Sequence, residues 1–477
     1  MLKNHILVNL EENLSYAPTQ SQARLFGVLA DFIAQRQANE ILLITGYAGT
    51  GKTTTVKSLI RTLQAFKIKS VLLAPTGRAA KVLSAYAGKP AYTIHKRIYR
   101  QKSASGGLGD FVLEKNLHKN TYFIIDEASM ISNQSFEMSI FGSGRLLDDL
   151  VDYVGQGSGC KLILIGDSAQ LPPVKMDLSP ALDPVQMEGY GARIRQAFLS
   201  DILRQSAESG ILYNATRIRR MIEGDQGGFP QLETDRFDDI ERVGGSELIE
   251  VITEAFDHYG MEEAVVVTRS NKRANLFNQG IRNQILWREE ELAVGDFLMV
   301  VKNNYYWLDE EEALDFIANG DIGEVTRIHG YQELYGFKFA DVRLRFVDYD
   351  DIELDAKVLM NTLHSNQAAL SREENKQLYE RVMEDYQDEK TKKARYQKVK
   401  ENPFFNALQV KFAYAVTCHK AQGGQWRVVF VDHGFLNEDM VNKEFYRWLY
   451  TAFTRATDKL YLVNFHKTFF DEGEREN

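Results

Sequence analysis

The chain has 477 residues, of which 44% are hydrophobic and 26% are charged. This composition is typical of a soluble globular protein and excludes a disordered or collagen-like chain. At ~100–200 residues per domain, the length predicts roughly two to four domains. The net charge of −9 argues at first against a nucleic-acid partner.

Cysteine content and apolar runs bear on the cellular compartment. The two cysteines, Cys160 and Cys418, are too few for a disulfide framework and fit a reducing cytoplasm. The first residues become acidic too soon for a signal peptide, and no apolar run approaches the ~20 residues of a membrane span. We therefore expect a cytoplasmic protein with no membrane partner.

The charge is distributed unevenly along the chain. Positions 41–109 contain no acidic residue and carry +12, which leaves −21 for the rest of a chain whose total is −9. A basic stretch inside an acidic protein is typical of a face that binds a polyanion, although a solvated face is the alternative. We expect the basic side chains to line one positive groove: Lys52, Lys57, Arg61, Lys67, Lys69, Arg78, Lys81, Lys89, Lys96, Arg97, Arg100 and Lys102.

Short apolar runs alternate with helical stretches through the first part of the chain. This alternation predicts an α/β fold with parallel sheets that are covered on both faces. The Gly/Ser-rich stretch 100–116 is flanked by short strand-like pieces and predicts a protruding hairpin. The expected strands are 41–45, 70–74, 122–125, 161–165 and 264–268.

The pattern changes between positions 303 and 403. The runs 323–331, 337–349 and 351–359 alternate as strands do in a small β-barrel. The charged segment 371–401 follows, with Leu378, Val382 and Tyr386 at helical spacing. Because strand-like α/β texture resumes at 407–417, we interpret the barrel as an insertion.

The aromatic run 305–307 lies at the start of this region. Its rings have the chemistry to stack on nucleic-acid bases, but packing inside the protein is the favoured interpretation.

The segment Gly46–Thr53 matches the phosphate-binding pattern G-x-x-x-x-G-K-[ST] between a predicted strand and a predicted helix. Backbone N–H groups at a helix N-terminus bind anions, Lys52 would reach the β- and γ-phosphates, and Thr53 would bind Mg²⁺. We therefore expect ATP and Mg²⁺ as cofactors. The expected nucleotide contacts are Gly46, Ala48, Gly49, Thr50, Gly51, Lys52, Thr53 and Thr54.

Carboxylates and an amide follow two later strands. Asp126 would hold Mg²⁺ and Glu127 would polarise the attacking water. The alternative is that both carboxylates lie in a solvated turn and have no catalytic role. Gln170 could hydrogen-bond a γ-phosphate or water, and an ordinary exit from the strand is its alternative.

Arg204 and Arg455 complete the catalytic candidates. A guanidinium from a second domain stabilises the charge that spreads in phosphoryl transfer. A structural salt bridge is an equally open interpretation of either arginine.

The motifs GYAGTGKT, LLAPTGRAA, TIHK, IIDEAS, GDSAQLPPV, LRQ, YAVTCHKAQGGQW and YTAFTRA occur in the order of those of superfamily 1 DNA helicases. The chain resembles the RecD and Dda type, which translocates 5′→3′ on single-stranded DNA. The resemblance implies two RecA-like domains, a strand-separating hairpin and an inserted SH3-like barrel. The implied ranges are 1–200 for the first domain with the hairpin at 96–116, 201–302 and 404–477 for the second domain, and 303–403 for the barrel.

The resemblance also implies binding roles for particular residues. Gln22 would contact adenine, and Gln422 with Gly423 would link DNA to ATP. Contacts to the DNA backbone carry no sequence code, so we expect sequence-independent binding of single strands and of single-strand/duplex junctions. The implied DNA contacts are Thr76, Arg78, His95, Lys96, Thr417, His419 and Lys420.

An ATP-dependent DNA helicase is the function that this resemblance implies. The alternatives are a DNA-stimulated ATPase subunit of a repair or recombination complex and a non-enzymatic DNA-binding subunit. No set of residues predicts a nuclease or relaxase. Within the resemblance, we expect the shorter Dda type and not a RecD protein with a long N-terminal domain. We expect a monomer that has partners in replication or repair.

Overall fold

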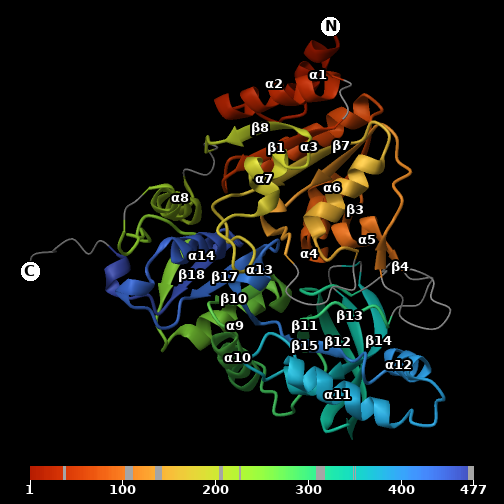
Figure 1. Ribbon diagram of the computed structural model, residues 1–477. Coiled ribbons are helices and arrows are strands. Elements are labelled where there is room, and N and C mark those ends of the chain that lie inside the picture. Colours follow the sequence, from red (N-terminus) through yellow and green to blue (C-terminus); the bar gives the residue numbers. More distant parts are fainter. Residues whose placement is uncertain are drawn as a thin grey trace, which may run out of the picture.

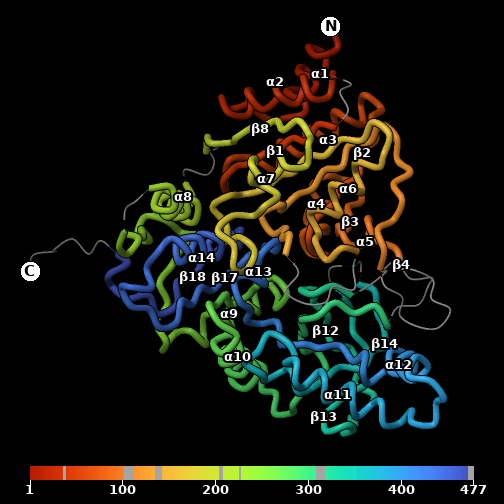
Figure 2. Tube along the Cα trace, viewed as in Figure 1, coloured from red at the N-terminus to blue at the C-terminus, as the bar shows by residue number. Residues whose placement is uncertain are grey.

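The computed structural model describes residues 1–35, 39–101, 111–134, 142–202, 208–224, 227–307, 317–346, 349 and 351–470. Figure 1 shows the N-terminal sheet domain at the top, a second sheet domain at the lower left and a β-barrel at the lower right. Figure 2 follows the chain from the second sheet (green) into the barrel (teal and cyan) and back to the same sheet (blue). The barrel is therefore an insertion in the second sheet domain.

The first domain is built on a six-stranded parallel sheet of order β3-β2-β6-β7-β1-β8. Its central strands are continuous apolar runs because helices cover both faces of the sheet. The strands are β1 (Glu40–Gly46), β2 (Lys69–Ala74), β3 (Ala91–Thr93), β6 (Thr121–Ile125), β7 (Lys161–Gly166) and β8 (Arg193–Leu199).

Two hydrophobic cores lie on the two faces of this sheet. One core contains the apolar sides of α1 (Leu2–Glu12), α2 (Gln20–Ala34), α3 (Lys52–Ala65) and α4 (Gly77–Ala87). The other core contains those of α5 (Ile94–Ile98), α6 (Leu146–Gln156), η1 (Ala128–Met130), η2 (Pro180–Leu182) and α7 (Pro184–Glu188).

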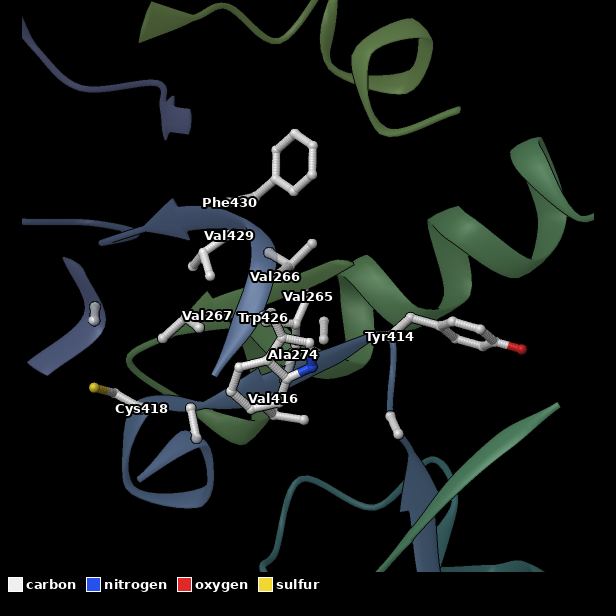
Figure 3. Packing of buried hydrophobic residues seen from close by; sticks show 14 of the residues in the cluster. Val265, Val266, Val267, Ala274, Tyr414, Val416, Cys418, Trp426, Val429 and Phe430 are labelled. Carbon is white, nitrogen blue, oxygen red and sulfur yellow. The ribbon is translucent and has the colours of Figure 1, made fainter. Parts of the chain in front are cut away.

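The second domain has a five-stranded parallel sheet of order β16-β10-β17-β18-β9. Figure 3 shows Trp426 among Val265, Val267 and Val416, while the hydroxyl of Tyr414 points away from them. The strands are β9 (Ile240–Val243), β10 (Ala264–Thr268), β16 (Ala415–Thr417), β17 (Trp426–Asp432) and β18 (Ala456–Val463). The helices are α8 (Gly210–Glu223), α9 (Leu248–Tyr259), α10 (Asn271–Gly280), α13 (Cys418–Ala421) and α14 (Lys443–Phe453), with short turns η4 (Met261–Glu263), η5 (Ile281–Ile285), η7 (Glu438–Met440) and η8 (Lys467–Phe469).

A closed barrel of β11, β12, β13, β14 and β15 confirms the inserted barrel. Its first and last strands lie outside the expected range of 303–403, so those two boundaries are wrong. Both strands are short and buried at every position, and the apolar run of the first, FLMV, looks like a strand of a covered parallel sheet. The last strand, LQVKF, also buries Gln409 and Lys411, and it is followed closely by β16 of the second sheet. The strands are β11 (Phe297–Val300), β12 (Ile322–Leu334), β13 (Phe337–Phe346), β14 (Ile352–Leu359) and β15 (Leu408–Phe412), and η6 (Met360–Thr362) follows β14.

Buried polar groups fix the junction between the barrel and the second sheet. Asn278 of α10 donates to the carbonyls of Phe412 and Ala415 and accepts from the Ala415 N–H, at 3.2, 2.9 and 2.7 Å. Asp296 pairs with Arg282 and accepts from the Tyr414 hydroxyl at 2.9 Å. The chain therefore enters and leaves the barrel through hydrogen-bonded, buried segments.

The charged segment 371–401 forms α11 (Arg372–Glu384) and α12 (Lys392–Lys400) against the barrel. Ser371 caps α11: its hydroxyl accepts from the Glu374 N–H, and the Glu374 carboxylate accepts from the Ser371 N–H. Leu378 and Val382 pack into a core with Phe339 of β13, and the partly buried Tyr386 follows the helix end. The predicted helical stripe is therefore confirmed.

The base of the predicted hairpin is an antiparallel pair of β4 (Tyr99–Gln101) and β5 (Phe111–Leu113). Residues 102–110 lie outside the described residues. The ring of Phe111 lies 4.6 Å, centroid to centroid, from that of Tyr305. Trp307 donates through Nε1 to the Asn406 carbonyl at 2.8 Å. These contacts favour the packing interpretation of the aromatic run.

The basic segment divides between two edges of the first sheet, so the expectation of one groove is wrong. Lys69 begins β2, whereas Arg78 lies after that strand has ended. At ~3.3 Å per residue, the strand separates these two positions by roughly 20 Å. Lys89 donates to the Ser70 carbonyl at 2.5 Å, and therefore also belongs to the amino edge of the sheet. Only part of the positive charge of residues 41–109 therefore lies at the edge of the sheet where the parallel strands end.

We expect Leu378→Ala to destabilise the barrel by about 2–5 kcal/mol, because it leaves a cavity between α11 and β13. Hydrogen exchange of the β13 and β14 amides measures this loss. Lys376→Ala on the exposed face of the same helix is the matched control and should change exchange by less than about 0.5 kcal/mol. Equal effects of both variants would show that α11 does not stabilise the barrel.

Candidate nucleotide site

The glycine-rich loop lies between the end of β1 and the start of α3, as its sequence predicts. Gly49 and Gly51 have φ angles of 73° and 81°, a conformation that disfavours other residues. Thr50 is buried and donates to the Tyr47 carbonyl at 2.7 Å, which stabilises the loop. Thr53 and Thr54 lie in the first turn of α3, and Thr53 is exposed.

The Lys52 ammonium lies inside this loop. Its Nζ donates to the carbonyls of Gly46 and Tyr47 at 2.8 and 2.9 Å, and lies 3.4 Å from Oδ2 of Asp167. A cation beside backbone amides at a helix N-terminus is suited to bind phosphate. The predicted loop residues are therefore assembled into one anion-binding turn.

Asp126 and Glu127 follow the end of β6. Asp126 accepts from the Tyr86 hydroxyl at 2.5 Å and from the Glu127 N–H at 2.9 Å. Glu127 has φ 53°, a left-handed backbone that is costly for a non-glycine residue and is often found at functional sites. Burial raises the pKa of Glu127, while the charge of Arg455 acts in the opposite direction.

Asp167 and Gln170 follow β7 and are both buried. Asp167 accepts from the Ala169 N–H at 3.0 Å through Oδ1. Within the part of the chain that the structure describes, the buried Oε1 of Gln170 has no hydrogen-bond partner. An amide with a free acceptor fits the predicted contact to water, because a water molecule can donate to it.

Residues of the second domain contact this edge of the first sheet. The Tyr450 hydroxyl of α14 accepts from the Ala48 N–H at 2.8 Å and donates to Oδ2 of Asp167 at 2.7 Å. Thr451 accepts from the Leu171 N–H at 2.8 Å, and Gln422 donates to the Leu171 carbonyl at 2.6 Å. Gln422 therefore lies at the domain interface, against the segment of the first domain that follows β7.

Arg455 is buried, and its donors bond within the second domain. It donates to the carbonyls of Thr451 and Gly424, each at 3.1 Å, and to the Thr454 hydroxyl at 3.2 Å. Its charge nevertheless influences the pKa of Glu127 across the interface. Arg204, the other predicted arginine, lies outside the described residues.

Gln22 is fully buried at the start of α2. Its Oε1 accepts from the Thr19 N–H at 3.0 Å, and its Nε2 donates to the Tyr16 hydroxyl at 3.3 Å. Both ends of the amide are therefore engaged in the structure, and the adenine contact stays a prediction.

Two of the predicted DNA contacts, Thr76 and Arg78, lie against the second domain. Thr76 caps α4, and a Cβ added to Gly423 would lie 3.2 Å from its Oγ1. The Arg78 guanidinium lies 3.9 Å above the Trp426 ring and donates to the Gln425 carbonyl at 3.2 Å. The segment after α13 is therefore packed on the start of α4.

The other predicted DNA contacts lie on α5, at the end of β16 and on α13. Burial lowers the pKa of His95 to about 4 and also lowers that of His419, so both rings are neutral near pH 7. Lys420 donates to Asn319 of the barrel, and burial lowers its pKa to about 8. Lys96 on α5 lies beside the ring of Tyr92, which belongs to β3, and Thr417 is the last residue of β16. The two histidines could therefore contact DNA as neutral hydrogen-bonding groups.

The barrel also contacts the start of α4. A Cβ on Gly77 would collide with the Tyr349 hydroxyl, which donates to Asp321 at 2.9 Å. The glycine of LLAPTGRAA thus permits the close approach of the barrel to the first domain.

Sequence reasoning missed several tyrosines at this site. Tyr86 bonds Asp126, Tyr450 bonds the loop, and the ring of Tyr47 lies 4.3 Å below the Arg219 guanidinium of α8. Tyr450 belongs to the motif YTAFTRA, so its position in a helicase motif could have indicated a functional role. No spacing in the sequence distinguishes Tyr86 from a core residue.

The metal prediction was tested against the acidic side chains. No group of at least three His, Cys, Asp or Glu residues suited to a metal ion occurs among the described residues. Mg²⁺ usually keeps several waters and binds one or two carboxylates together with substrate phosphates. Thr53 and Asp126 beside a phosphate-binding loop fit that pattern.

Among the described helices, none has the length and apolar character needed to cross a membrane.

The loop, the carboxylates at strand ends and the second parallel sheet form the arrangement of a P-loop fold with two RecA-like domains. Residues 28–234 match the family described as AAA domain, and residues 412–463 match the UvrD-like helicase C-terminal domain. Together with the relatives below, these matches confirm the resemblance to superfamily 1 helicases of the RecD and Dda type.

The relatives are helicases from a bacterium and a phage. The ATP-dependent RecD2 DNA helicase of Deinococcus radiodurans is 24% identical over 458 residues, which cover 93% of this chain and 50% of that protein. This chain thus spans about half the length of that relative. The ATP-dependent DNA helicase dda of Enterobacteria phage T4 is 25% identical over 324 residues, which cover 65% of this chain and 67% of that protein.

Among solved structures, Pif1 helicase from Bacteroides in complex with ADP-AlF3 and ssDNA aligns with 96% of this chain and 95% of its own. The TM-score is 0.46 and the sequence identity is 16%.

We expect Glu127→Gln to lower the rate of ATP hydrolysis by about 10²–10⁴-fold, because the amide cannot accept a proton from water. In the unchanged protein, the rate should fall as pH drops through the pKa of Glu127, and burial places this fall above the usual range of a glutamate. A pH–rate profile measures both effects. Glu188→Gln, at an exposed position on α7, is the control, and a fall only at the usual glutamate pH would contradict the assignment.

Proposed function

We propose that the protein is an ATP-dependent DNA helicase, which hydrolyses ATP to translocate 5′→3′ on single-stranded DNA and to unwind duplex. One observation carries the proposal: Ala48 and Asp167, which lie beside Lys52 in the first RecA-like domain, bond Tyr450 of the second, and the charge of Arg455 acts on Glu127 across the same interface. The relatives named as ATP-dependent DNA helicases support it. The polarity rests on the resemblance to the RecD and Dda type.

The site residues have distinct roles in this proposal. Lys52 binds the β- and γ-phosphates, and Thr53 with Asp126 would hold Mg²⁺, which supplies charge neutralisation on the phosphates. Glu127 orients the attacking water and accepts its proton, while the Gln170 amide hydrogen-bonds that water or the γ-phosphate. Arg455 stabilises negative charge from the opposite domain, and Arg204 stays a candidate for the same task.

Hydrolysis is coupled to movement through the interface. A γ-phosphate bound at Lys52 would lie between the two domains, so its loss would change the contacts that favour closure. The contact between Gly423 and α4 then shifts together with the DNA-binding segments on either side. Thr76 and Thr417 would hold successive backbone positions of the strand, without reading its sequence. The hairpin at 96–116 would separate the duplex ahead of them.

We expect Lys52→Ala to retain binding to single-stranded DNA but to lose ATP hydrolysis and unwinding, because the phosphate-binding cation is removed. DNA-stimulated ATPase and strand-displacement assays on 5′-tailed, 3′-tailed and RNA-tailed duplexes measure this. Unwinding by the variant would refute the proposal. Hydrolysis without unwinding by the unchanged protein would instead identify the ATPase-subunit alternative.

We expect Lys96→Ala to weaken single-stranded DNA binding equally for all sequences and to reduce the salt slope of log K by about 0.7, the value for one phosphate contact. Lys69→Ala is the matched control, because Lys69 belongs to the same basic segment but begins β2 at the opposite edge. Fluorescence anisotropy with labelled oligonucleotides at several salt concentrations measures the slope. Identical slopes for both variants would remove α5 from the DNA interface.

A further inference from the structure

The Tyr450 hydroxyl connects the two RecA-like domains at the phosphate-binding loop. Its side chain is buried on α14, yet both of its hydrogen bonds cross to the first domain. It accepts from the Ala48 N–H at 2.8 Å and donates to Oδ2 of Asp167 at 2.7 Å. The same hydroxyl thus contacts the loop and the carboxylate beside it.

The Asp167 oxygen that accepts from Tyr450 also faces the Lys52 ammonium. The Lys52 Nζ lies 3.4 Å from Oδ2 of Asp167, but only 2.8 and 2.9 Å from the loop carbonyls. Asp167 is 1% exposed, so water cannot replace a lost donor without reorganisation. Tyr450 and Lys52 therefore share one buried acceptor.

The hydroxyl is a permanent donor at physiological pH. Burial, followed by the charge of Asp167, raises the pKa of Tyr450 well above its usual range. Of the Asp167 oxygens, Oδ1 is engaged by the Ala169 N–H, which leaves Oδ2 to the two competing donors.

We propose that Tyr450 is a positioning residue that couples closure of the two domains to the placement of the Lys52 ammonium. This inference rests on the proposed function, because it assigns the hydroxyl a part in nucleotide binding. With the domains in contact, Tyr450 satisfies Asp167, and Lys52 is held only loosely by the carboxylate. With the domains apart, Asp167 loses this donor and draws Lys52 away from the position of the phosphates.

The consequence is cooperativity between nucleotide binding and closure. A nucleotide binds more tightly to the closed form because Lys52 is released toward it, so binding must favour closure by the same factor. DNA that holds the two domains together should strengthen nucleotide binding through the same hydroxyl.

Tyr446 provides a matched control on the same helix. It is buried like Tyr450, and its hydroxyl donates at 2.8 Å to the Gly228 carbonyl, within the second domain. Tyr446→Phe therefore removes one buried hydroxyl from α14 without touching the interface.

The experiment compares Tyr450→Phe and Tyr446→Phe in the full chain. Equilibrium binding of a non-hydrolysable ATP analogue is measured with and without single-stranded DNA, together with kcat and KM for ATP. We expect Tyr450→Phe to weaken analogue binding in the presence of DNA, and to raise KM, by about tenfold, with kcat changed less than about threefold. Tyr446→Phe should leave all of these values unchanged.

A second substitution tests the shared carboxylate. In the Tyr450→Phe background, Asp167→Asn should restore part of the analogue affinity, because a neutral amide no longer draws Lys52 away. Equal affinities for Tyr450→Phe and Tyr446→Phe, or a loss confined to kcat, would overturn the inference. Absence of DNA-stimulated hydrolysis in the unchanged protein would overturn the proposed function instead, since analogue binding still reports on Tyr450.

Discussion

The parallel arrangement of the first sheet is the constraint on which the site depends. Because its neighbouring strands run in the same direction, their carboxyl ends lie at one edge, where β1, β6 and β7 deliver the loop, Glu127 and Asp167. Helices that cover both faces leave this edge as the exit for the polar residues. Residues widely separated in sequence are thereby brought within hydrogen-bonding or electrostatic reach of Lys52.

Polar contacts close this edge, beside the apolar packing of Ala169 and Leu171 against the core of the second domain. Leu171 is held by its backbone N–H and carbonyl, Ala48 by its N–H, and Asp167 by a hydroxyl, all from the second domain. The hydrogen bonds to Leu171 and Ala48 have a modest net stability because water can replace them when the surfaces separate, whereas Asp167 turns to Lys52. Such bonds let the interface open and close repeatedly, which a purely apolar interface of large area would resist.

The sequence predicts those parts of the fold that depend on local pattern. The central strands, the phosphate-binding loop, the barrel and the α11 stripe each follow from apolar periodicity or from a fixed spacing of glycines. The barrel boundaries were missed because Phe297–Val300 is a continuous apolar run, as in a covered parallel sheet, and because Leu408–Phe412 is followed closely by Ala415–Thr417 of the second sheet.

Tertiary placement decided the features that local pattern could not. Lys69 and Arg78 are close in sequence but lie at opposite ends of one strand, so a continuous basic segment does not form a continuous surface. Tyr86 and Tyr450 reach carboxylates that are distant in sequence, at 2.5 and 2.7 Å. The capping contact of Gln22 depends on the exact turn before α2, which spacing alone does not determine. Arg204 stays a sequence prediction.

The double attachment of the barrel makes it a lever arm of the second domain. Asn278, Asp296 and Tyr414 fasten both ends of the insertion to the second sheet through buried hydrogen bonds. A small rotation at the nucleotide interface is therefore transmitted to the barrel without loss at a flexible linker, and the displacement grows with distance from the pivot. Where the barrel meets the first domain, Gly77 has no side chain, so the Tyr349 hydroxyl approaches the start of α4 closely and no Cβ blocks movement of the barrel there.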